Sequence, residues 1–248
     1  MNRNLKALGA ALVAVFATAA VLASAAQAQI KVTVSPSPAW LTAEVIEHPN
    51  IGKTQTFKLA GGQTLSCEET SSVATVKNGD TSITVVPTFK KCTAVIGTES
   101  HLVTATMNDC DFVLHGGETA SPGSTTFING LVDLVCPEGK QVEMHIYKAA
   151  AGETEELCTY KIAPFVNKGG GNEIHNVAGS PNDITGVGTL TGISTTRTGS
   201  LLCGAANTTA TVTGSATIKA FEDKGGSISN GTVSGLVEGL QTSLTISD

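Results

Sequence analysis

Apolar and polar residues alternate in short runs along most of the chain after residue 29. The strictest run covers 141–148, where the apolar residues Val142, Met144 and Ile146 are separated by polar ones. A period of two places one face of a strand in a core and the other in water, so this run predicts a half-buried β-strand. Weaker runs predict further strands at 54–59, 102–107, 110–115 and 131–136.

The pair Asn78-Gly79 lies between two alternating runs and predicts a β-hairpin. An Asn-Gly pair favours a two-residue type I′ turn, because both residues tolerate positive φ angles. That register would place Ala74 opposite Ile83. Pro87 lacks a backbone N–H, so we expect the second strand of this hairpin at an edge of its sheet. Another hairpin turn is predicted at 151–154.

The composition favours β structure throughout. Thr, Val, Ser and Gly are abundant, and Gly, Pro or Asn-Gly interrupts each apolar stretch after residue 29. Short, punctuated stretches of this kind are typical of antiparallel β proteins. We therefore predict an all-β fold with an antiparallel β-sandwich-like body, built as one unit or as two packed β subdomains and stabilised by disulfides.

The first residues have the pattern of an export signal. Arg3 and Lys6 precede an uncharged, Ala-rich run at 7–23, and Ala26-Gln27-Ala28 has small residues at the two positions that a signal peptidase reads. We expect cleavage before Gln29, with an uncleaved anchor as the alternative. The run is slightly shorter than the ~20 residues of a spanning helix, and no second long apolar run follows. The expected mature chain is secreted, extracellular or held in the cell envelope, without a transmembrane segment.

Composition divides the chain into five segments. Ser35-Pro36-Ser37-Pro38 predicts an extended tether, and Gly169-Gly170-Gly171 predicts an internal boundary. The expected segments are a signal peptide (1–28), a Ser/Pro-containing extended linker (29–45), a main β domain (46–166), a Gly-rich connection (167–182) and a C-terminal β region (183–248).

The charge balance argues against a nucleic-acid partner. The full chain has 15 Lys and Arg against 21 Asp and Glu, a net charge of −6. Loss of Arg3 and Lys6 with the signal leaves 13 basic residues and a net charge near −8. Phosphate binding needs clustered Lys and Arg, and Lys90-Lys91 is the only adjacent basic pair.

An even number of cysteines in an exported chain indicates disulfides. The type I′ register places Cys67 opposite Lys90, which leaves Cys92 as a diagonal neighbour at about 7 Å, within disulfide reach only if a β-bulge intervenes. We expect Cys67–Cys92 as the best-supported bridge. The six candidates are Cys67, Cys92, Cys110, Cys136, Cys158 and Cys203.

The other pairings are less constrained. Symmetry about residue 123 favours Cys110 with Cys136, which leaves Cys158 for Cys203. Cys136 with Cys158 is the alternative, because both flank one predicted hairpin.

Two groups of residues are candidates for metal binding. Asp109 and Asp111 would share one strand face, about 7 Å apart, where Ca²⁺ could bind. His101, His115 and His145 lie in or beside predicted strands and could converge on zinc. Neither group has the close spacing of a known metal motif, so ordinary surface side chains are the simpler interpretation. We predict no metal and no cofactor.

The polar face of the strand at 141–148 is the strongest candidate for a binding surface. It combines hydrogen-bond donors, acceptors and a ring, as surfaces that bind glycans or protein partners do, although an ordinary exposed sheet has the same mixture. Its members are Gln141, Glu143, His145 and Tyr147.

The motifs of common enzymes are missing from the sequence. Neither GxSxG nor HExxH occurs. Gly52-Lys53-Thr54 superficially matches a P-loop, but Glu47 occupies the position of its first glycine. We therefore favour a non-enzymatic binding or structural β module with a cell-envelope or glycan partner. The alternative is a secreted hydrolase whose catalytic carboxylates and histidine come from separate strands, namely Asp109, Asp111, Glu143 and His145.

Several short segments carry a resemblance to known proteins. They are Met107-Asn108-Asp109-Cys110, the segment VDLVCPEGK at 132–140, and Cys158-Thr159 ahead of Lys161-Ile162 and Pro164. Together they resemble a group of uncharacterised secreted, cysteine-containing, β-rich proteins of actinobacterial type, over roughly Cys67 to Phe221. The resemblance implies secretion and β structure, and it implies no activity.

Overall fold

The computed structural model describes residues 31–35, 37, 39–45, 55–116, 128–148, 154–167, 172–176, 183–222, 227–229, 232–234 and 243–247. The predicted signal peptide, the hairpin turn at 151–153 and the glycines at 169–171 lie outside these residues. Within the described part, no helix is long and apolar enough to cross a membrane. Its only helix is the short 3₁₀ helix η1 (Leu201–Cys203).

All other elements are β-strands. They are β1 (Lys31–Ser35), β2 (Ala39–Val45), β3 (Gln55–Leu59), β4 (Thr64–Val76), β5 (Ser82–Ile96), β6 (Glu99–Thr106), β7 (Asp111–Gly116), β8 (Ile128–Val135), β9 (Val142–Tyr147), β10 (Glu156–Ile162), β11 (Asn172–Asn176), β12 (Asp183–Gly199), β13 (Asn207–Glu222), β14 (Ser227–Ser229), β15 (Thr232–Ser234) and β16 (Ser243–Ser247).

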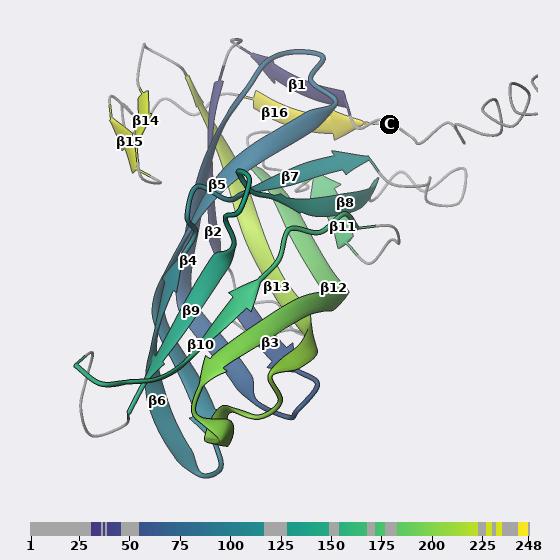
Figure 1. The fold of residues 1–248 in the computed structure, drawn as a ribbon. Coiled ribbons are helices and arrows are strands. Elements are labelled where there is room, and N and C mark those ends of the chain that lie inside the picture. Colours follow the sequence, from purple (N-terminus) through teal and green to yellow (C-terminus); the bar gives the residue numbers. More distant parts are fainter. Residues whose placement is uncertain are drawn as a thin grey trace, which may run out of the picture.

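Twelve of the strands form one antiparallel sheet that closes on itself (Figure 1). The long strands pair as two ladders, β4–β5 and β12–β13, which run through the whole sheet. In the upper part of Figure 1, β7, β8 and β11 join the ladders on one side and β2 joins them on the other. In the lower part, β6, β9 and β10 join them on one side and β3 on the other. We call these two eight-stranded circuits the upper ring and the lower ring.

The structure confirms the all-β, antiparallel prediction, but the sheet is a closed barrel rather than a sandwich. The strands of the region 183–248 are the reason. β12 and β13 pair with β10 and β11 on one side and with β2 and β3 on the other, so they close the sheet between its two ends. Alternation of inward and outward side chains is common to barrels and sandwiches, and it cannot distinguish them.

The chain on both sides of the predicted Gly-rich connection contributes to this one sheet. The segment expected to be an extended linker contains β1 and β2, and β2 pairs with both β4 and β13. Both strands follow period-two alternation, with Val32, Val34, Ala39 and Leu41 almost fully buried. Apolar residues at these positions bury more surface than a solvated tether would, and this favours strands.

Each ring encloses its own apolar core. The upper core includes Leu41, Ile83 and Ile184, and the lower core includes Met144 and Tyr160. β9 has the predicted alternation, with every second residue buried. Eight strands make a barrel whose interior is just wide enough to be filled by side chains or to hold one small ligand.

The turn between β4 and β5 differs from the predicted type I′ turn. It spans five residues, and only Gly79 has a positive φ angle, of 87°. The backbone N–H of Val34 donates to Asn78 Oδ1 at 2.6 Å, and Gly79 N–H donates to the Val32 carbonyl at 2.9 Å. β1 therefore packs on this turn, and Val73 faces Val86, two residues away from the predicted register.

Pro87 lies within the sheet, and the predicted edge position of its strand is wrong. β5 pairs with β4 at Val86–Val95, with β7 at Ser82–Val85 and with β6 at Cys92–Ile96. Pro87 falls in the gap between β7 and β6, where no strand pairs with that side of β5. A proline in the middle of a sheet is tolerated where no ladder hydrogen bond is required.

Three disulfides join Cys67 to Cys92, Cys110 to Cys136 and Cys158 to Cys203, as the favoured pairings predicted. Cys67 lies directly opposite Cys92 rather than diagonal to it, with 3.9 Å between the Cα atoms. The shift of the β4–β5 register by two residues, together with a positive φ of 49° at Lys91, brings the two cysteines to the same inward face. The alternative pairing of Cys136 with Cys158 is wrong.

Candidate functional site

A row of glycines and amide side chains crosses the inner wall where the two rings meet. Asn172 of β11 pairs with Gly130 of β8 on one side and with Gly188 of β12 on the other. Gly188 in turn faces Gly214 of β13. Gln55 of β3 follows in the next strand and lies against Gly214. Three of these five neighbouring positions therefore lack a side chain.

The two amide side chains occupy the space that the glycines leave. A Cβ atom added at Gly188 would lie 1.9 Å from Asn172 Oδ1, and one added at Gly214 would lie 2.4 Å from Gln55 Oε1. Such distances are far below van der Waals contact, so any larger residue at either position would have to displace an amide group. The amides of Asn172 and Gln55 consequently lie directly against the β12–β13 ladder.

This row borders a cavity of about 180 Å³ that lies between the two cores and is partly open to the outside. Gly186 of β12 also lines the cavity, and a Cβ atom there would meet nothing within 4 Å. A smaller void of about 20 Å³ lies next to it, where Phe89 and Phe112 line both spaces. Apolar side chains make up most of the cavity wall, including Val85, Pro87, Leu114, Val132, Ile174, Leu190, Val212 and Ile218.

The polar groups of the wall are incompletely paired. Asn172 is 93% buried, since its exposed fraction is 7%. Its Nδ2 donates to the Gly130 carbonyl at 3.3 Å, whereas no described residue donates a hydrogen bond to its Oδ1. The Gln55 amide has no hydrogen-bond partner in the described part of the chain. Among the described residues, the fully buried side-chain atoms that lack a partner are Asp183 Oδ1 and Arg197 Nε, so Asn172 Oδ1 and the half-buried Gln55 amide keep some accessible surface. A ligand or a water molecule in the cavity can complete their hydrogen bonding.

The predicted binding surface on β9 lies on the outside of the lower ring. Glu143, His145 and Tyr147 are half-buried there, and Gln141 precedes the strand. The tyrosine hydroxyl is 3.2 Å from Thr104 Oγ1 on β6, and the Gln141 carbonyl accepts a hydrogen bond from Asn108 Nδ2 at 2.8 Å. Glu143, His145 and Tyr147 therefore share one face of β9, and none of the four predicted residues borders either cavity.

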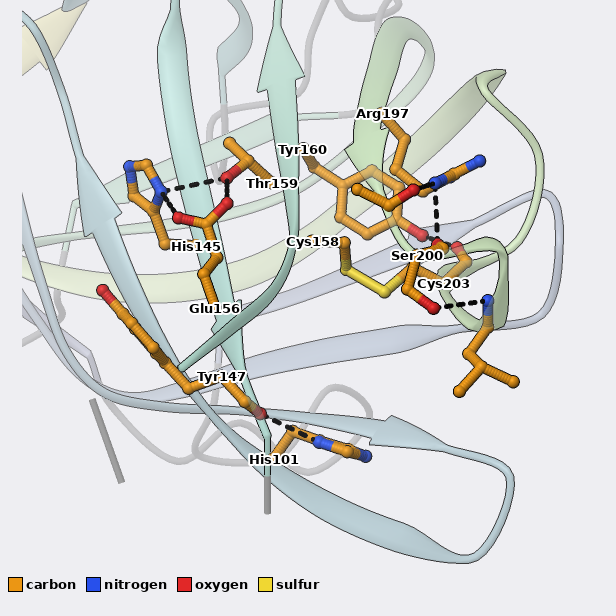
Figure 2. Close-up of a disulfide and its surroundings, with 12 residues drawn as sticks. His101, His145, Tyr147, Glu156, Cys158, Thr159, Tyr160, Arg197, Ser200 and Cys203 are labelled. Atoms are coloured by element: carbon orange, nitrogen blue, oxygen red, sulfur yellow. Dashed lines mark hydrogen bonds and ion pairs between the residues drawn. A yellow bond between two sulfur atoms is a disulfide. The ribbon is translucent and has the colours of Figure 1, made fainter. Parts of the chain in front are cut away.

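His145 is the centre of a polar network on this face (Figure 2). Its Nδ1 is 3.0 Å from Glu156 Oε2, and its Nε2 is 3.5 Å from Glu143 Oε2. Thr159 Oγ1 donates to Glu156 and is also 3.0 Å from His145 Nδ1. Lys161 Nζ binds Glu143 at 2.8 Å. Partners within the protein thus occupy Glu143 and His145, two of the groups that we expected to bind a ligand or to catalyse.

The network lowers the pKa values of two carboxyl groups, those of Glu143 and Glu156. The hydrogen bond from Lys161 is the largest cause that lowers the pKa of Glu143, and the charge of His145 lowers it further. The hydrogen bond from Thr159 is the largest cause that lowers the pKa of Glu156. Both residues are therefore ionised carboxylates at neutral pH, as acceptors in a surface network require.

The histidines do not converge on a metal. His101 Nδ1 is 2.9 Å from the Tyr147 carbonyl (Figure 2), and His115 Nε2 is 3.0 Å from Asp133 Oδ2 on β8. Each predicted histidine thus has its own partner on a different part of the wall. Within the described ranges, no group of three or more His, Cys, Asp or Glu side chains is arranged to hold a metal ion.

The two aspartates around Cys110 interact electrostatically. Burial is the largest cause that raises the pKa of Asp111, and the neighbouring charge of Asp109 raises it further. Asn108 and Asp109 have positive φ angles, of 52° and 61°, so this segment is a turn rather than the expected strand face. The aspartates border neither cavity, and Glu143 and His145 lie on the outer wall.

The Cys158–Cys203 disulfide anchors the lower end of the barrel (Figure 2). The Tyr160 hydroxyl donates to the Cys203 carbonyl, and burial raises the pKa of this tyrosine. Arg197 Nη1 donates to the carbonyls of Gly199 and Ser200, at 2.6 and 2.7 Å. These contacts fix the chain from β12 to η1, so this cluster has a structural role.

Sequence reasoning missed the cavity and its amides. Asn172 directly follows the glycines that predicted a flexible connection, and it is instead the first residue of β11. One signal was available: glycines at 186 and 188 interrupt an otherwise regular alternation from Ile184 to Leu190. Glycine within a strand marks a place where another group approaches closely.

Comparison with protein-family models, with curated proteins and with solved structures finds no match to this chain.

Proposed function

We propose that this chain is an exported, non-enzymatic binding protein that holds a small apolar molecule inside its barrel. The observation that supports this is the cavity of about 180 Å³ at the junction of the two rings. Protein interiors are normally packed with few voids larger than a water molecule. A space of this size, bordered by glycines in the middle of strands, is a costly feature for a purely structural module.

The dimensions limit the ligand. An apolar cavity of about 150 Å³ binds benzene, whereas drug-sized ligands need roughly 300–1,000 Å³. The ligand is therefore a molecule of about one ring, or a short branched alkyl chain. The aromatic side chains of Phe89 and Phe112 line the space and favour a ring.

Export is part of the proposal. Its support is the charged, apolar and small-residue pattern of the first 28 residues, together with three disulfides. Disulfides persist mainly in oxidising compartments outside the cytosol. A hydrolase is not proposed, because its four candidate residues border neither cavity, and Glu143 and His145 are occupied by partners on the outer surface.

Titration with toluene tests the proposal. Residues 29–248, with the disulfides formed, are titrated with toluene by NMR and by calorimetry. We expect saturable binding at one site and a rise in thermal stability that increases with ligand concentration. The variant Gly186→Val fills open space in the wall and should abolish binding. Thr189→Val, an exposed and nearly isosteric change on the same strand, is the matched control and should bind normally.

Two results would contradict the proposal. One is the absence of saturable binding by the folded wild-type protein. The other is equal binding by wild type and a folded Gly186→Val variant, which would place the toluene outside the cavity.

A further inference from the structure

The polar groups of the cavity define a more specific ligand. This inference rests on the proposed function, because it concerns the same cavity. Asn172 Oδ1 is an acceptor without a donor among the described residues, and its amide is held in place by the bond from Nδ2 to the Gly130 carbonyl. Gln55 supplies an unpaired acceptor and unpaired donors at the opposite end of the same row. A ligand in this site can therefore donate a hydrogen bond to an amide oxygen and accept one from the Gln55 amide nitrogen.

The two amides are close enough to contact one small polar group. They lie over Gly188 and Gly214, which face each other across the β12–β13 ladder. The Cα atoms of such a pair are about 4.5–5.5 Å apart. A single hydroxyl oxygen between the amides can donate one hydrogen bond and accept another.

The charged groups near the cavity do not favour an ionic ligand. Glu173 borders the cavity, but its side chain is exposed and lies 3.2 Å from His175 on the same strand. No Lys or Arg lines the cavity in the described part of the chain. An ion without a buried counterion would bear a large desolvation cost in such an apolar space.

We propose that the cavity binds a small monocyclic phenol, with its ring among the apolar side chains and its hydroxyl between Asn172 and Gln55. The hydroxyl donates to an amide oxygen and accepts from Gln55 Nε2. The ring occupies the open space beside Gly186, where an added Cβ atom would meet nothing within 4 Å. A site built to bond a hydroxyl rejects an analogue that lacks it, because its own polar groups then stay unpaired.

Three matched ligands test this directly on the wild-type mature protein. Phenol has a donor and an acceptor, anisole has an acceptor only, and toluene has neither. We expect phenol to bind about tenfold more tightly than toluene or more, as expected for one satisfied buried hydrogen bond. Anisole should fall close to toluene, because it cannot donate to Asn172 Oδ1.

Two variants then test whether the preference for phenol over toluene depends on the two amides. Asn172→Leu and Gln55→Leu remove the amides with little change in volume and should reduce the phenol-to-toluene ratio to near one. Gln63→Leu is the matched control. Gln63 lies beside Gly204 rather than at the cavity, so this variant should keep the wild-type ratio.

The outcomes separate this inference from the proposed function. Equal affinities for phenol and toluene in the wild type would overturn the phenol assignment and leave ring binding intact. A phenol preference that survives both folded amide variants would also overturn it. Binding of none of the three ligands would overturn the proposed function itself. The wild-type comparison needs no variant, so it stands even if an amide substitution prevents folding.

Discussion

Asn172 and Gly188 are matched across the β11–β12 ladder, so that the amide of one occupies the volume where the other would carry a Cβ atom. The distance from that Cβ position to Asn172 Oδ1 is 1.9 Å, and the distance to Asn172 Cβ is 3.2 Å. Rotation of the amide alone cannot relieve the contact, because the Asn172 Cβ is also close. The glycine is therefore required by its neighbour and not by its own backbone conformation.

We predict that Gly188→Ala lowers the free energy of unfolding by about 1–3 kcal/mol, the usual cost of overpacking. Gly186→Ala is the comparison, because its Cβ meets nothing within 4 Å. It should be neutral or stabilising by up to about 1 kcal/mol, since it restricts the unfolded chain without a clash. Urea unfolding of both variants measures the difference. Equal stabilities would show that the Asn172 amide moves away at no cost.

Gly199 is a second glycine with a defined neighbour. Its φ is +90°, and an added Cβ would lie 2.7 Å from the Leu157 carbonyl and 2.8 Å from Cys158 Cα. We expect Gly199→Ala to destabilise the protein by more than the ~1–2 kcal/mol that a left-handed conformation costs an L-residue. Gly79→Ala is the control, because Gly79 has a similar φ of +87° and open space at the Cβ position. A loss no larger than that of Gly79→Ala would contradict the clash.

The disulfides should differ in their contribution to stability. The Cys67–Cys92 and Cys158–Cys203 bridges close sequence separations of 25 and 45 residues. In the chain-entropy description, removal of each pair by paired Ala substitutions should cost about 3.5 and 4 kcal/mol respectively. Guanidinium unfolding of the two double variants tests the order. The expectation fails if the shorter loop proves the more stabilising.

The network around His145 should make part of the stability depend on pH. The pKa values of Glu143 and Glu156 are lowered in the folded state, so their stabilising effect is fully present above the unfolded pKa of ~4.3. It is lost as the pH falls through the lowered pKa values. Lys161→Met removes the hydrogen bond that is the largest cause of the lowered pKa of Glu143. Thr159→Val removes the hydrogen bond that is the largest cause of the lowered pKa of Glu156. Each variant should be less stable than wild type at pH 7 by a margin that shrinks below pH ~4.

Urea unfolding at several pH values measures these margins. Lys58→Met, at an exposed position on the outer face of β3, serves as a control for the loss of a lysine charge. A margin between Lys161→Met and wild type that stays constant from pH 7 to pH 3 would mean that Glu143 gains nothing from Lys161.

Local pattern was sufficient for strands such as β9 and for the favoured disulfide pairs, but not for β1, β2 and β11, which lie in segments predicted to be a linker and a Gly-rich connection. The alternation at 142–147 specified which residues of β9 are buried, because the side-chain period of a strand is fixed by its backbone. The cysteines of the β4–β5 hairpin were paired correctly although the register was two residues out. The predicted pairing was correct despite the wrong register because the two cysteines lie on neighbouring strands, whose register β-bulges and turn length can adjust.

Contacts between residues distant in sequence determined the shape of the β4–β5 turn and the partners of the outward residues of β9, which the local pattern of apolar and polar residues did not specify. The turn at 77–81 has its shape because β1 docks on it through Asn78 and Gly79. The outward residues of β9 form a closed network because Glu156, Thr159 and Lys161 arrive from the next strand. A single segment carries no information about these partners.

The sequence by itself determined an antiparallel β protein with three disulfides, because strand periodicity and cysteine placement are local properties of the chain. Only the tertiary structure decided that the sheet closes into two stacked rings and that Asn172, Gly188, Gly214 and Gln55 form one row beside a cavity. Closure depends on pairing between β13 and strands more than one hundred residues earlier, β2 and β3. Such pairing is set by the packing of the whole sheet, and the space inside it exists only once the sheet has closed.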